Sequence, residues 1–227
     1  YAIIGTMLAH LTVLLALRWI VSGHVPLSSG FETMQFLAWS ILLFTLLVLN
    51  KFPIIMGFAP LLASFAMLVA MIGSGSPRIT PLMPVLQSPL LSVHVMVIMF
   101  SYALFALMML IGVQGLVMHW KGDAVREESF AALSHTLLYP AVFLLTVGIF
   151  VGAVWANVSW GCYWSWDPKE VWALITMFVY MAPLHSSSLK SFRKPTFFHV
   201  YCIVAFLSVL MTYFGVNFFL GGMHSYA

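Results

Sequence analysis

The sequence predicts an all-α, polytopic integral membrane protein of about seven transmembrane helices joined by short loops. Hydrophobic residues make up 63% of its 227 residues, charged residues only 7%, and the mean hydropathy is +1.05. So few charges could not cover the surface of a soluble domain. Apolar stretches of about 18 residues or more recur along the whole chain, which is typical of helices that cross a bilayer. The formal charge of +3 is too small to indicate binding to nucleic acid.

Breaks in the apolar sequence delimit the first four predicted spans. They lie at about 1–22, 33–50, 53–72 and 90–118. Turns rich in Gly, Ser and Pro end the first and the third, and Lys51 ends the second. The loop before the fourth span holds too many prolines for a regular helix, namely Pro77, Pro81, Pro84 and Pro89.

Polar connectors and a Trp-rich loop delimit the last three spans, at about 131–154, 168–185 and 196–220. The connectors cover about 119–129 and 186–195. The start of the sixth span has a helix-capping pattern. Asp167 suits the N-cap, Pro168 the first helical position, and Glu170 completes a capping box.

Basic residues predict the orientation of these spans, because cytoplasmic loops carry an excess of Lys and Arg. One side is predicted to hold six of them: Lys51, Lys121, Arg126, Lys190, Arg193 and Lys194. The other side is predicted to hold three: Arg18, Arg78 and Lys169. The first side is therefore predicted to be cytoplasmic. The Trp-rich loop, the Pro-rich loop and the C-terminal tail then face out of the cytoplasm.

The Trp-rich loop, W-G-C-Y-W-S-W-D at 160–167, is the most unusual stretch of the chain. Trp160, Trp164 and Trp166 lie within seven positions, beside Gly161 and before Asp167. Interfacial Trp can form an aromatic belt, but a belt distributes its indoles over several helix ends. The concentration in one loop favours a flat apolar platform for a large planar ligand. Asp167 has a structural interpretation as well, as the helix cap that fixes this platform.

Histidines form the second informative set, since imidazole in or beside a bilayer core is costly. His94 and His224 are predicted to lie on the same side as the Trp-rich loop, where two imidazoles could form an axial pair for haem iron. A membrane histidine is otherwise most often a packing or hydrogen-bonding residue. His185 lies about 27 Å beyond Asp167 along the sixth span, so it cannot ligate the same iron as His94 and His224. The weaker candidates are His10, His24, His135 and two residues expected to be solvated, His119 and His199.

Several stretches carry a family resemblance. The run W-G-C-Y-W-S-W-D-P-K-E-V-W-A-L at 160–174 resembles the WWD signature of a superfamily of haem-handling proteins. Its Asp-Pro-Lys-Glu continuation resembles the CcsA (ResC-like) component of system II cytochrome c synthase. The stretches 23–33, 86–94 and 215–226 agree with this component. The relatives CcmC and CcmF carry the signature with a different continuation.

The resemblance implies a set of haem contacts. His94 and His224 match the axial ligands of a haem b, which is both substrate and bound ligand, held under the Trp-rich loop. His185 matches a transmembrane histidine that ligates a haem arriving from the cytoplasmic side, whose second ligand comes from a CcsB-like protein. Cys162 falls at a variable position of the signature, and a disulfide with Cys202 or a zinc site is not expected.

The resemblance also implies a function in cytochrome c biogenesis. As a holocytochrome c synthase of the haem lyase type, the protein would receive haem across the membrane and promote its thioether attachment to Cys-x-x-Cys-His of apocytochrome c. The implied partners are a CcsB-like membrane protein, separate or fused, the apocytochrome, and a thiol-reducing partner for it. The expected location is the bacterial cytoplasmic membrane rather than the plastid thylakoid, with the Trp-rich loop facing the periplasm.

Two other functions are compatible with parts of the pattern. A haem exporter or carrier would use the same histidines and indoles without ligation chemistry, and a generic multi-span transporter with an aromatic belt would bind no haem. The whole of 1–227 is expected to be one CcsA-type domain. Because Tyr1 opens the chain inside an apolar run, we expect this domain to be part of a longer or fused CcsB–CcsA protein.

Overall fold

Seven α-helices make up most of the described chain, which covers residues 2–50, 52–72, 78–79 and 81–220 of a computed structural model. No strand occurs within these ranges. The α-helices are α1 (Ala2–Ser22), α2 (Gly30–Val48), α3 (Ala59–Ile72), α4 (Pro89–Trp120), α5 (Ala124–Trp160), α6 (Pro168–Met181) and α7 (Pro195–Leu210). Shorter elements are η1 (Pro53–Gly57), η2 (Pro84–Gln87), η3 (Ala182–His185), η4 (Lys190–Arg193) and the π-helix η5 (Met211–Leu220), which continues α7.

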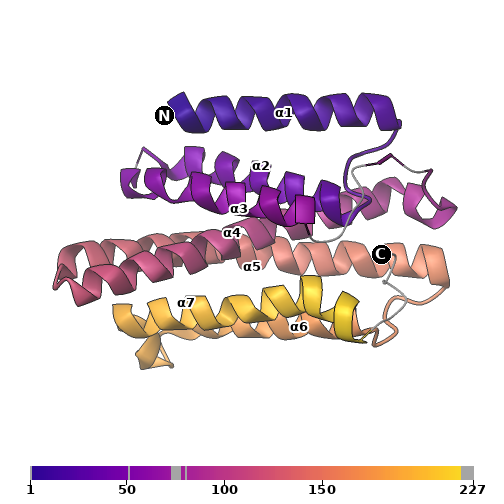
Figure 1. The fold of residues 1–227 in the computed structure, drawn as a ribbon. Helices are drawn as coiled ribbons and strands as arrows, with labels where there is room; N and C mark the ends of the chain where they lie inside the picture. Colours follow the sequence, from indigo (N-terminus) through magenta and orange to yellow (C-terminus); the bar gives the residue numbers. More distant parts are fainter. Residues whose placement is uncertain (1, 51, 73–77, 80, 221–227) are drawn as a thin grey trace.

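The helices run alongside one another, up and down, from α1 at one edge to α6 and α7 at the other (Figure 1). Five of them are long and apolar enough to cross a membrane: α1, α2, α4, α5 and α7 with η5. α3 is apolar but shorter, and α6 has only 14 residues before η3 continues it. The chain is therefore an all-α, multi-pass integral membrane protein, as its composition predicts.

The connections between helices are distributed over the two ends of the bundle as the sequence predicts. The Trp-rich loop and the start of α4 lie at one end, and the α4–α5 and α6–α7 connections lie at the other (Figure 1). Lys51 and the Gly-Ser-rich turn at 73–77 lie outside the described residues.

Helix α5 is longer than the sequence pattern predicts, at both ends. The expected polar connector at 119–129 is a short turn, since α5 begins at Ala124 behind Asp123, whose carboxylate accepts a hydrogen bond from Arg126 N at 3.1 Å. Charged residues outside the apolar core are good helix formers, so loss of hydropathy did not mark a helix end. Trp160 likewise belongs to the last turn of α5 and not to the loop. Gly161, at φ +79°, ends the helix in the left-handed conformation.

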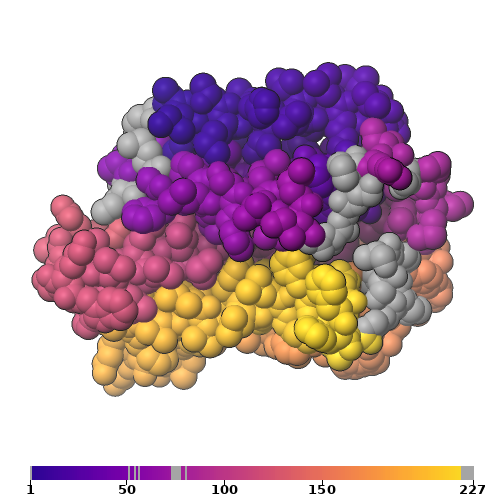
Figure 2. Space-filling model, viewed as in Figure 1, coloured from indigo at the N-terminus to yellow at the C-terminus, as the bar shows by residue number. Residues whose placement is uncertain are grey.

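Helix α4 lies at the centre and packs along α5 through glycines. A Cβ added to Gly148 would lie 2.5 Å from Ile98 Cδ1, so a larger residue at this position would require the Ile98 side chain to shift. On another side of α4, Phe105 stacks on Tyr180 of α6 with ring centroids 3.6 Å apart. α1 instead forms the outer edge of the molecule, above α2 (Figure 2).

Candidate functional site

A cavity of about 530 Å³ lies at the end of the bundle that holds the Trp-rich loop. Segments far apart in the sequence build its wall. Its lining residues include Arg78, His94, Ile98, Gly152, Trp164, Lys169, Glu170, Tyr213 and Asn217. A cavity of this size and mixed lining is typical of sites for cofactor-sized ligands.

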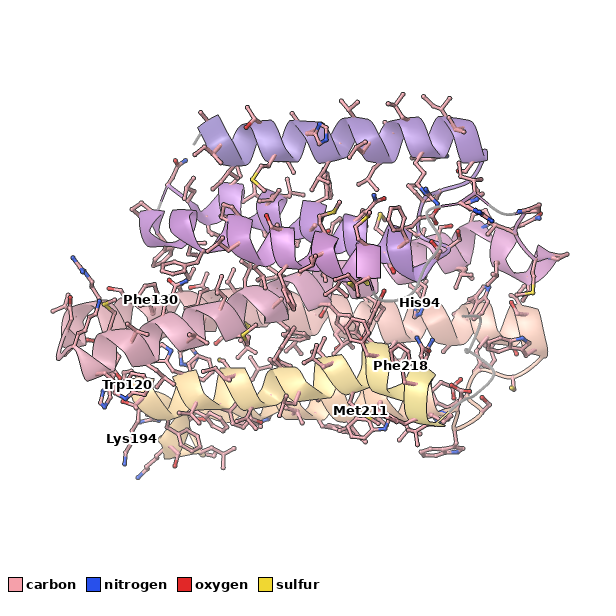
Figure 3. The ribbon with its side chains drawn as sticks, viewed as in Figure 1. His94, Trp120, Phe130, Lys194, Met211 and Phe218 are labelled. Atoms are coloured by element: carbon pink, nitrogen blue, oxygen red, sulfur yellow. The ribbon has the colours of Figure 1, made fainter. Side chains whose placement is uncertain are left out.

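His94 lies in the second turn of α4 (Figure 3) and lines this cavity. Its Nδ1 lies 2.7 Å from the carbonyl oxygen of Gly148 on α5. A carbonyl oxygen can only accept a hydrogen bond, so Nδ1 carries the hydrogen of the neutral ring and the lone pair lies on Nε2. Histidines that ligate metals are commonly oriented in this way by a backbone carbonyl.

Gly152 provides the space in which the His94 ring lies. A Cβ at this position would lie 2.5 Å from His94 Cε1 and 2.6 Å from Nδ1. Gly148 and Gly152 are one helical turn apart on α5, so both face the His94 ring. The carbonyl oxygen of Gly148 orients the ring, and the missing side chain of Gly152 leaves space for it. These glycines were not among the predicted site residues, although their four-residue spacing in the sequence was a usable signal.

The three predicted indoles take different positions and do not form one flat platform. Trp164 lines the cavity. Trp166 is 71% exposed, has a φ of +60° and stands at 89° to Trp164 with centroids 5.9 Å apart. Trp160 packs on the buried Trp155 of α5 at 4.7 Å and 71°. One indole therefore contributes to the wall, a second anchors the end of α5, and the third projects from the loop.

The predicted cap at the start of α6 is confirmed. The Asp167 carboxylate accepts a hydrogen bond from Lys169 N at 3.0 Å, and Asp167 N donates to Glu170 Oε2 at 3.2 Å. Glu170 Oε2 also accepts from Ser165 N at 2.8 Å, which the sequence did not reveal. The loop that carries Trp164 is thus tied to α6 on both sides of Trp166.

The remaining predicted ligands lie elsewhere. His224 is outside the described residues. His185 is exposed at the end of η3, where its Nδ1 lies 3.1 Å from Met181 O, at the far end of α6 from the Trp-rich loop. His185 therefore lies away from the cavity that His94 lines. Its position in the sequence predicts this separation.

A second polar cluster, at the opposite end of the bundle, corrects one prediction. His119 Nδ1 lies within hydrogen-bonding distance of Glu127 Oε2, at 3.0 Å, and the Thr196 hydroxyl donates to Glu127 Oε1 at 2.6 Å. His199, expected to be solvated, is fully buried, with Nε2 3.1 Å from Glu127 O. Its ring lies where a side chain on Gly115 would be, so the burial arises from a glycine in a neighbouring helix that the local sequence does not reveal.

Two polar residues of the cavity wall, Tyr213 and Asn217, were not predicted from the sequence. Asn217 of η5 donates from Nδ2 to Tyr213 O at 3.1 Å, and its buried Oδ1 has no hydrogen-bond partner among the described residues. The Tyr213 hydroxyl lies 2.6 Å from the hydroxyl of Thr33 on α2. Because an unpartnered buried acceptor is costly, Asn217 indicates a cavity that accommodates a polar ligand group or water.

Comparison with known proteins gives a consistent result. Residues 27–224 match the family described as cytochrome C assembly protein. The chain is 37% identical over 234 residues to Protein NrfI of Wolinella succinogenes, covering all of this chain and 26% of that protein. Against the cytochrome c biogenesis protein CcsA it is 38% identical in Chlamydomonas reinhardtii, covering 95% of the chain and 65% of the relative. In Pyropia yezoensis the identity to CcsA is 34%, covering 95% and 83%. The chain thus spans about a quarter of NrfI and under two thirds of the Chlamydomonas protein.

Proposed function

Since this chain belongs to the cytochrome c assembly protein family, we propose that it binds haem b as a substrate and promotes its covalent attachment to apocytochrome c. It would act as a holocytochrome c synthase of the haem lyase type. The observation that carries the proposal is the geometry of His94, whose Nδ1 faces Gly148 O inside a cavity lined by Trp164. This arrangement supports the proposal, because an oriented imidazole beside an aromatic wall suits a planar iron porphyrin.

The residues of the cavity fit haem in three respects. An imidazole with its lone pair on Nε2 suits iron, an indole and several aliphatic side chains suit the macrocycle, and polar groups lie among them. His224 is the proposed second axial ligand. It follows Asn217, which lines the cavity, by seven residues, and an extended chain of that length spans at most about 25 Å.

In the proposed reaction the protein supplies position and the substrates supply the reacting groups. Two axial imidazoles leave no open iron position, which slows attack by oxidants while haem is held. The histidine of Cys-x-x-Cys-His in the apocytochrome then displaces one of them. Each thiol adds across a vinyl group, with sulfur bonding the carbon next to the ring and hydrogen the terminal carbon. No electrons are gained or lost, provided a thiol-reducing partner keeps both cysteines reduced.

His185 is proposed to ligate haem before it reaches the outer site. Its position at the opposite end of α6 supports a separate step, with the second ligand supplied by a CcsB-like protein, fused or separate. We place the protein in the bacterial cytoplasmic membrane, with the Trp-rich loop facing outward and the Lys- and Arg-containing connections inward. Residues 1–227 would then form one CcsA-type domain of a longer protein.

A visible spectrum of the purified protein tests the haem site. We expect a Soret band of bis-imidazole haem that is lost on replacement of His94 and His224 together. An unchanged spectrum in the double variant would refute the ligand assignment, and absence of any Soret band with added haem would refute haem binding.

Analysis of the reaction product distinguishes the synthase from the alternative, a haem carrier without ligation chemistry. The protein and a CcsB-like partner are co-expressed with an apocytochrome, and covalently attached haem is detected after denaturation. Attached haem supports the synthase. Bound haem in the membrane protein without any attached product supports the carrier.

A further inference from the structure

Trp166 has a backbone conformation that residues with large side chains rarely adopt. Its φ of +60° is the one positive value at a non-glycine position in the described part of the chain. A residue with a Cβ is strained in this left-handed region, and the strain persists only where surrounding contacts hold the backbone. Because Trp166 is 71% exposed, burial of its own indole does not compensate for that strain.

The carboxylate of Glu170 supplies holding contacts on both sides of Trp166. Its Oε2 accepts a hydrogen bond from Ser165 N at 2.8 Å and another from Asp167 N at 3.2 Å. The Ser165 hydroxyl also lies 3.3 Å from each carboxylate oxygen. Hydrogen bonds to a charged acceptor are among the stronger ones in proteins, so these contacts can offset the strain of the residue between them.

A helix cap alone does not explain these contacts. In the capping box of α6, the side chain of Glu170 needs to accept only from Asp167 N. The contacts with Ser165 lie outside that motif, on the far side of Trp166. They bind the Trp-rich loop itself, so Glu170 has a second structural role there.

The conformation of Trp166 also bears on the position of the other indole of the loop. Trp164 lines the cavity of His94, and its ring stands at 89° to that of Trp166 with centroids 5.9 Å apart. The chain passes from Trp164 through Trp166 into α6 within a few residues. A relaxation of φ at Trp166 would therefore rotate the segment that carries Trp164 relative to α6 and move this indole from the cavity wall.

We propose that Glu170 is a positioning residue for haem, which holds Trp166 in the left-handed conformation and thereby keeps Trp164 in the cavity wall. The inference rests on the proposed function, in which the indole of Trp164 faces the macrocycle. It assigns to Glu170 an effect on haem binding that is exerted through the backbone of the loop. This effect should disappear when residue 166 no longer needs to be held.

The first measurement removes the carboxylate. The complete membrane protein is purified in detergent and titrated with haem b by Soret absorbance. Glu170→Ala should weaken haem binding about tenfold, because the loop loses its acceptor. The circular dichroism of the Soret band should change as well, since it depends on the aromatic groups beside haem. Glu170→Gln keeps an acceptor oxygen and should remain within about threefold of wild type.

The second measurement tests the strain at residue 166. Glycine adopts positive φ without the steric cost of a Cβ, so in a Trp166→Gly background Glu170→Ala should weaken haem binding by less than about threefold. Trp166→Ala is the matched control, since it removes the same indole and keeps a Cβ. In that background, Glu170→Ala should still weaken haem binding about tenfold.

Equal losses from Glu170→Ala in the two backgrounds would overturn the proposal, since Glu170 would then act independently of the strain at residue 166. Wild-type affinity and Soret circular dichroism in Glu170→Ala would overturn it too. If Glu170→Ala does not fold, the single variants decide. Trp166→Gly should unfold at a higher temperature than Trp166→Ala, and an equal or lower value would refute the strain.

Failure of this inference is distinguishable from failure of the proposed function. A bis-imidazole Soret spectrum of the wild-type protein would uphold the haem site even where the substitutions at Glu170 and Trp166 had none of the expected effects. Absence of any Soret band with added haem would instead refute the proposed function, and the positioning role with it.

Discussion

The Nδ1 atom of His94 lies 2.7 Å from the carbonyl oxygen of Gly148, so a side chain of α4 is oriented by the backbone of α5. This hydrogen bond crosses between the two helices at the cavity and sets which ring nitrogen faces a ligand. Since the α5 carbonyl is part of a helix, its position is fixed more firmly than a side-chain acceptor would be. The ligand geometry at the cavity therefore depends on the α4–α5 packing.

Gly152→Ala should weaken haem binding by displacing the His94 ring. The new Cβ would lie 2.5 Å from Cε1, and a rigid imidazole bonded to Gly148 cannot move aside without losing that hydrogen bond. We expect haem affinity to fall at least about tenfold, equivalent to about 1.4 kcal/mol, in a Soret titration. Gly5→Ala is the matched control, since nothing lies within 4 Å of its added Cβ. If Gly152→Ala bound haem with wild-type affinity, the proposed role of Gly152 in leaving space for the His94 ring would be contradicted.

Asp167→Ala should destabilise the start of α6 and the loop before it. Loss of the cap hydrogen bond to Lys169 N costs about 1 kcal/mol. We expect a lower thermal unfolding temperature in detergent and faster proteolysis at 161–166. Asp167→Asn keeps a capping side chain and should remain near wild type in both measurements. If Asn were as damaging as Ala, the negative charge and not the cap would be the important property.

Patterns of neighbouring residues predicted the helices of the fold well, whereas contacts between helices could not be predicted from the sequence. The Asp167 to Glu170 cap needs only four consecutive residues, so its pattern was sufficient. Burial of His199 depends on Gly115, and the seat of His94 depends on Gly152, each in another helix. The π-helical turn pattern of η5 has no simple sequence signal either, although it helps place Asn217 at the cavity.

Thr196→Val should destabilise the protein without changing the haem site. The variant loses the 2.6 Å hydrogen bond to Glu127 Oε1, which links α7 to α5 at the end opposite the cavity. A hydrogen bond to a charged group contributes about 1.5–3 kcal/mol, so we expect a lower unfolding temperature. Thr196→Ser should retain the bond and the stability. An altered Soret spectrum in Thr196→Val with bound haem would show that the two ends are coupled.

His185→Ala should reduce the delivery of haem to the outer site without weakening haem binding there. The residue is exposed at the end of η3, far along α6 from the cavity, so its loss leaves the contacts of His94 intact. Haem added to the purified variant should therefore give the wild-type spectrum. Protein isolated from cells should instead contain less haem at the outer site, because the proposed first ligand is missing. His94→Ala should fail in both measurements. Normal haem content in His185→Ala isolated from cells would exclude His185 from the delivery path.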